Sequence, residues 1–78
     1  MKDRLPTLKA RDIIKVLMKL GFYKVRQKGA HICFKHFDGR FTLVPSHGGE
    51  DIGRGLLGQI LREVKLTPAE FLKNLRNK

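Results

Sequence analysis

The sequence contains few acidic residues, one cysteine, no tryptophan and no long apolar segment. Its 17 Lys and Arg are opposed by only 7 Asp and Glu, so the formal net charge is +10. A charge this high goes beyond what solubility requires and indicates an acidic partner, either nucleic acid or an acidic protein surface. The lone cysteine, Cys33, excludes an internal disulfide.

Targeting and membrane signals are also lacking. No apolar run approaches the roughly 20 residues of a spanning helix, and the basic N-terminus is not followed by the apolar segment of a signal peptide. We therefore expect no membrane partner and a cytoplasmic location. The 78 residues show no repeat, linker or low-complexity tract, so we predict one domain over residues 1–78. A core this small, without disulfide support, favours a partner protein.

Apolar spacing predicts a first helix that starts near Thr7 and stops at Gly21, with Phe22 making the contact that follows a glycine cap. Strands are predicted over residues 23–28, 30–37 and 40–44, because the dipeptide Asp38-Gly39 is a strong signal for a tight hairpin. The apolar stripe of the first helix comprises Ile13, Val16, Leu17 and Leu20, widened by Ile14 and Met18.

Two further helices are predicted after the loop at residues 46–50. The last one has a complete start: Thr67 as N-cap, Pro68 at the first position and Glu70 closing a capping box, with Leu66 and Phe71 as a hydrophobic staple. The expected order is α-β-β-β-α-α, which is an α+β fold with a three-stranded antiparallel sheet and helices on one face. The preceding helix carries Leu57, Ile60, Leu61 and Val64 at helical spacing.

Alternation along the second strand separates two faces of the sheet. Ile32 and Phe34 are expected to anchor the core, with Phe41 and Leu43 of the third strand beside them. His36 shares the face of Ile32, so we interpret it as structural.

The other face carries the candidate site. His31 and Lys35 are expected to point outward, and Arg26 and Lys28 join them if the register allows. His31 directly follows Gly29 and Ala30, where backbone and substrate could approach closely. From Ile13 to Phe37 there are six Lys or Arg and no Asp or Glu, so this histidine lies in a positive field that suits a polyanion.

Metal chemistry is not indicated. His31 and His36 point to opposite faces, and the four ligands of a zinc site cannot be completed nearby. We predict no metal and no cofactor, and we interpret Cys33 as small apolar packing.

RNA cleavage needs no metal, because the 2′-hydroxyl beside each phosphate is a built-in nucleophile. The reaction requires a base for that proton, an acid for the departing 5′-oxygen and positive charge at the phosphorane. His31 is the candidate proton carrier, and His47 or a lysine is the candidate second group. The phosphate-binding candidates are Arg26, Lys28 and Lys35.

Five segments together resemble the HicA-type mRNA interferases, the toxins of HicA/HicB toxin–antitoxin pairs: residues 20–22, 26–31, 44–47, 55–57 and 66–72. The resemblance implies a fold like that of double-stranded-RNA-binding domains, an endoribonuclease with His31 as its catalytic histidine, mRNA as substrate and a HicB-like antitoxin as partner. Gly29, at the point of close approach before His31, is a further expected RNA contact. Two positions depart from the family pattern. Ala30 stands where a serine is usual, and Leu56 where a threonine is common, so each departure removes a hydroxyl.

A second reading of the same residues is a non-catalytic RNA-binding module of double-stranded-RNA-binding type, in which basic side chains contact the phosphates of an A-form helix. Both readings predict RNA binding. Only the first predicts cleavage that is lost with His31.

Overall fold

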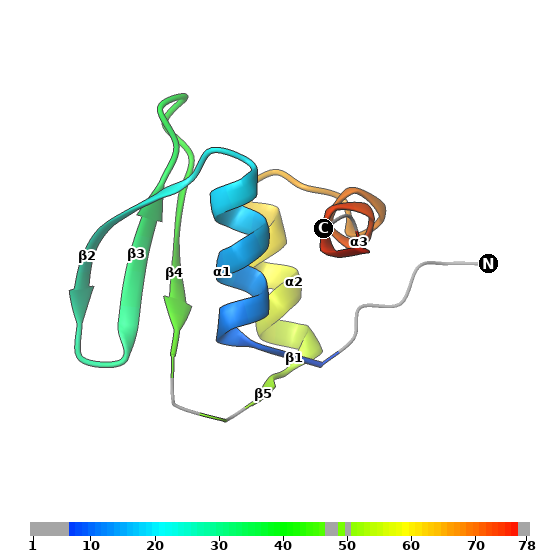
Figure 1. Cartoon of the computed structure of the whole chain (residues 1–78), viewed down its shortest axis with the longest axis horizontal. Coiled ribbons are helices and arrows are strands. Elements are labelled where there is room, and N and C mark those ends of the chain that lie inside the picture. The colour runs from blue at the N-terminus through cyan, green and yellow to red at the C-terminus, as the bar shows by residue number, and fades with distance from the viewer. Residues whose placement is uncertain (1–6, 47–48, 50, 77–78) are drawn as a thin grey trace.

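The computed structural model describes residues 7–46, 49 and 51–76 (Figure 1). The predicted α+β class and the three-stranded antiparallel sheet are confirmed. The elements, in chain order, are β1 (Leu8–Lys9), α1 (Ala10–Lys19), β2 (Tyr23–Lys28), β3 (His31–Lys35), β4 (Phe41–Pro45), β5 (Asp51–Ile52), α2 (Arg54–Glu63) and α3 (Pro68–Arg76).

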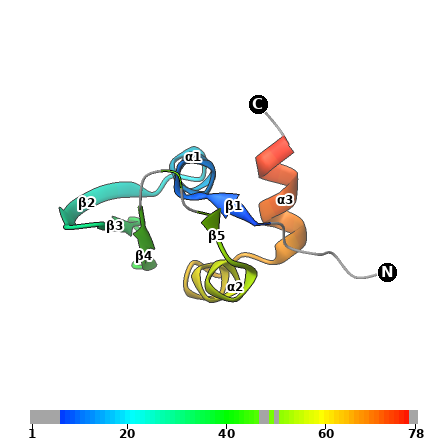
Figure 2. The same cartoon turned by 90° about the horizontal axis from the view of Figure 1, so that it is seen from below.

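The sheet has the strand order β2-β3-β4, and its two pairings are both antiparallel. Helix α1 lies over one face of this sheet, and α2 lies next to α1 along the β4 edge, so that both helices contact β4; α3 packs on them on the side away from the sheet (Figures 1 and 2). Within the described ranges, no helix covers the opposite face (Figure 2). One face of the sheet is therefore available for binding.

The first helix begins at Ala10, three residues later than predicted, because Leu8 and Lys9 form a short strand. This strand pairs antiparallel with β5, and the ammonium of Lys9 lies 2.7 Å from the Asp51 carboxylate. Neither two-residue strand was predicted, since such short segments carry no periodicity. The predicted stripe of α1 packs inward at Ile13, Val16 and Leu17, whereas Met18 is 57% exposed and the expectation for it was wrong.

The prediction for the inner face of the sheet was wrong for the two residues expected from the last strand. Ile32 and Phe34 are buried as expected, but Phe41 and Leu43 are exposed. In the observed register Ile32 pairs with Val44 and Phe34 pairs with Thr42, and residues directly opposite each other share a face. A polar residue therefore enters the core, where the Thr42 hydroxyl donates a hydrogen bond of 2.6 Å to Glu63.

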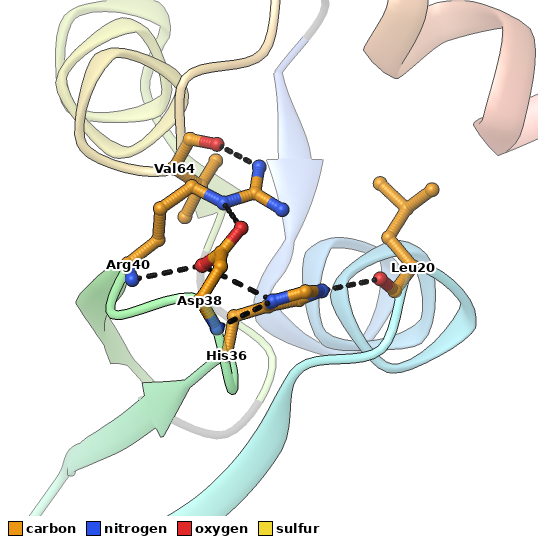
Figure 3. Close-up of polar contacts among 5 residues, drawn as sticks. All are labelled: Leu20, His36, Asp38, Arg40 and Val64. Atoms are coloured by element: carbon orange, nitrogen blue, oxygen red, sulfur yellow. Dashed lines mark hydrogen bonds and ion pairs between the residues drawn. The ribbon is translucent and has the colours of Figure 1, made fainter.

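The loop between β3 and β4 begins at His36, which is buried, as expected of a structural residue. Figure 3 shows its polar contacts. The Asp38 backbone N–H donates to Nδ1, so Nε2 carries the ring hydrogen and donates to the Leu20 carbonyl at 3.2 Å. Arg40 completes the cluster, because its guanidinium contacts the Asp38 carboxylate at 2.8 Å and donates to the Val64 carbonyl. The Arg40 backbone N–H, helped by this guanidinium, holds the pKa of Asp38 below its usual value. Histidine 36 thus joins the hairpin to the end of α1.

The start of α3 confirms the predicted capping box. The Thr67 hydroxyl accepts from the Glu70 backbone N–H at 3.1 Å, and the Glu70 carboxylate accepts from the Thr67 backbone N–H at 2.9 Å. The second of these bonds is the main reason that the pKa of Glu70 is lowered. Phe71 is fully buried and Leu66 packs against the same core.

Candidate functional site

His31 is the first residue of β3 and follows a two-residue turn made by Gly29 and Ala30. Gly29 has φ of +58°, as the first central residue of a type II′ turn requires. On the other side of the turn, the Ala30 carbonyl accepts a hydrogen bond from the Ser46 backbone N–H. The backbone around His31 is therefore held by a tight turn and by the end of β4, while its side chain is exposed.

The register places nine residues in three rows on the uncovered side of the sheet, and we call this surface the open face. The predicted alignment of Arg26 and Lys28 with His31 is confirmed. The two-residue turn sets this alignment by placing Lys28 opposite His31, and a bulge between Lys24 and Arg26 then brings Tyr23 opposite Lys35, because one extra residue changes which side chains face outward from that point. The rows are Lys28, His31 and Pro45; Arg26, Cys33 and Leu43; and Tyr23, Lys35 and Phe41.

Positive charge surrounds the histidine. Strands β2, β3 and β4 contain no Asp or Glu, and Arg26, Lys28 and Lys35 all belong to the open face. Arg26 and Lys28 line an open hollow of about 570 Å³ that also includes His31 and Cys33. The proposed proton carrier and two of the proposed phosphate-binding groups thus share one concave surface.

A second hollow, of about 220 Å³, runs between β4 and α2. His31 and Pro45 line it together with Leu43, Phe41 and four residues of α2. Sequence reasoning missed this groove because it assigned Phe41 and Leu43 to the core. The contribution of α2 comprises Leu56, Gln59, Ile60 and Glu63.

The remaining candidates have different positions. His36 lies in the buried cluster on the opposite face from His31, Cys33 is a half-buried free thiol, and His47 lies outside the described residues. Among the described residues, no three His, Cys, Asp or Glu side chains are grouped as metal ligands would be. None of the helices in this part of the chain has the length and apolar character needed to cross a membrane.

The fold and the site together define a small α+β domain whose open sheet face presents an exposed histidine among basic side chains. A comparison with family models gives a match to the family described as "HicA toxin of bacterial toxin-antitoxin" over residues 10–66. The matched segment runs from the start of α1 through α2 and includes His31. The chain therefore belongs to the HicA family of toxins of bacterial toxin–antitoxin systems. A comparison with curated proteins finds no match.

Both departures from the family pattern can now be placed. Ala30 is half-buried in the turn before His31, where its carbonyl is engaged by Ser46. Leu56 lies in the first turn of α2 and lines the groove beside His31. Each departure is thus a neighbour of the candidate site.

Proposed function

We propose that the chain is a metal-independent endoribonuclease that cleaves mRNA in the cytoplasm and is neutralised by a HicB-type antitoxin. One observation carries the proposal: in a member of a toxin family, His31 is exposed at the start of a strand, with Lys28 opposite it in register and Arg26 one row away. This arrangement combines a proton carrier with positive charge for a phosphate.

The chemistry follows from the substrate. The 2′-hydroxyl loses its proton as its oxygen attacks phosphorus, the bond to the 5′-oxygen breaks, and that oxygen takes up a proton. The products are a 2′,3′-cyclic phosphate and a 5′-hydroxyl. His31 carries a proton in this exchange, and Lys28 and Arg26 stabilise the charge on the phosphorane oxygens.

The antitoxin role follows from charge. A free toxin with a formal net charge of +10 attracts RNA without selection for sequence. A partner that offers acidic side chains to Arg26, Lys28 and Lys35 would neutralise this attraction and cover His31 at the same time.

The test uses purified protein and a short RNA with EDTA present. Cleavage is expected to persist with the chelator and to stop at a nucleotide whose 2′-hydroxyl is methylated, because that nucleotide has lost its nucleophile. Product ends are read by mass spectrometry, with the cyclic phosphate as the expected form. Binding without cleavage would favour the non-catalytic RNA-binding module, and cleavage abolished by EDTA would contradict metal independence.

The phosphate-binding role of Lys28 predicts a change in salt dependence. Each phosphate neutralised on a single strand contributes about −0.7 to the slope of log affinity against log salt. Lys28→Glu is expected to flatten this slope by about that amount. Lys73→Glu makes the same charge change at an exposed site on α3, away from the sheet, and serves as the control. Equal slopes for the two variants would place the phosphate contacts elsewhere.

A further inference from the structure

The open face has different chemistry at its two edges. At the β2 edge, two of the three rows of the open face begin with a cation, Lys28 or Arg26. On β4, all three rows end with an apolar residue: Pro45, Leu43 or Phe41. Phe41 is 57% exposed and Leu43 50%, so apolar surface remains uncovered beside a basic strip.

This change from cations on β2 to apolar side chains on β4 matches the two sides of a single-stranded polynucleotide. Its phosphates need cations, and its unpaired bases need flat apolar surface. Successive rows of a strand face lie about 6.6 Å apart, which is close to the step between phosphates of an extended strand. An RNA strand whose phosphates follow β2 and β3 would turn its bases toward β4.

We propose that the open face beyond His31 is a subsite for single-stranded RNA, in which Phe41 stacks on a nucleobase two rows away from the scissile phosphate. The proposal rests on the proposed function for the position of that phosphate. Lys35 lies between Tyr23 and Phe41 in the same row and binds the phosphate of the stacked nucleotide.

The surroundings of Phe41 favour RNA over a protein as the occupant. Phe41 also lines the groove that reaches His31, so the subsite is continuous with the candidate active site. Lys35 is the nearest charge in its row and lies on a strand without acidic residues. Glu63 lies beyond β4 on α2, where its carboxylate accepts from Thr42. Because a carboxylate repels phosphates, the RNA phosphates are kept on the β2 side.

The experiment measures binding of a short single-stranded RNA by fluorescence anisotropy, in a His31→Ala background so that the RNA stays intact. Phe41→Ala is expected to weaken binding roughly 5- to 100-fold, as loss of one stacked base does, without changing the salt slope. Phe41→Leu keeps apolar bulk but no ring and should bind as weakly. Met18→Ala is the control, because Met18 is also 57% exposed but lies on α1.

Phe41→Trp gives a direct signal, since the chain contains no tryptophan. Its binding should equal or exceed that of the parent, with indole fluorescence quenched by RNA. An RNA with one abasic position at the stacked nucleotide should bind the parent weakly and lose nothing more with Phe41→Ala. Circular dichroism checks that each variant is folded.

Unchanged RNA affinity in Phe41→Ala, with unquenched indole in Phe41→Trp, would overturn the subsite. Loss of antitoxin binding alone in Phe41→Ala would overturn it in favour of a protein-docking surface, and an absence of RNA binding by every form would overturn it as well. Failure of the proposed function has a different signature: the wild-type chain would bind RNA through Phe41 but leave it uncleaved.

Discussion

Replacement of His31 by alanine is expected to lower the single-turnover rate of RNA cleavage by at least 100-fold, the lower range for loss of a general acid–base group. The side chain is exposed at the end of a tight turn, so its removal leaves no cavity in the core. RNA affinity and melting temperature should therefore change little. Growth arrest on expression should disappear with the activity.

The control for this prediction is the pH profile. Because His31 is proposed to carry a proton, the wild-type rate should depend on pH, and the residual rate of His31→Ala should not follow the same curve. A His31→Ala protein that cleaves as fast as the wild type, or that remains equally toxic, would remove His31 from the mechanism. A variant that has lost RNA binding as well would assign His31 to binding.

The sequence was sufficient for the main elements because their signals are local. The capping box of Thr67 and Glu70 and the turn at Gly39 are short-range patterns, and both are present. The pairing of β1 with β5 was missed because it joins residues more than 40 positions apart, for example Leu8 and Ile52. A contact between residues so far apart produces no periodic pattern in the sequence.

The candidate site was predicted in part for a related reason. The outward position of His31 follows from alternation along one strand, with Ile32 and Phe34 as anchors. In β4, residues 41–44 offer apolar side chains on both faces, so alternation gives no direction. Thr42 is buried, and its hydroxyl donates to Glu63 on α2, a partner that strand periodicity cannot supply. Phe41 pairs with Lys35 in the observed register and therefore points to the opposite face, where its ring is exposed.

The cluster around His36 determines how the sheet is held against α1. The imidazole meets Phe22 edge-on at 5.0 Å between ring centroids and stacks on Phe37 at 4.6 Å. Its hydrogen bond to the Leu20 carbonyl holds Nε2 close to Gly21. A β-carbon at Gly21 would lie 3.0 Å from that nitrogen, so the ring has little room to move.

Gly21→Ala is therefore expected to destabilise the fold far more than Gly39→Ala. The two glycines have nearly the same φ, +100° and +101°, and a β-carbon at Gly39 would meet nothing within 4 Å. Both variants incur the cost of a strained backbone, about 1 to 3 kcal/mol, and Gly21→Ala adds overpacking against His36 of about 1 to 3 kcal/mol. The difference is measured as the shift in urea midpoint followed by circular dichroism, with equal slopes as the check on two-state unfolding. Equal midpoints for the two variants would mean that His36 moves freely and does not fix the hairpin to α1.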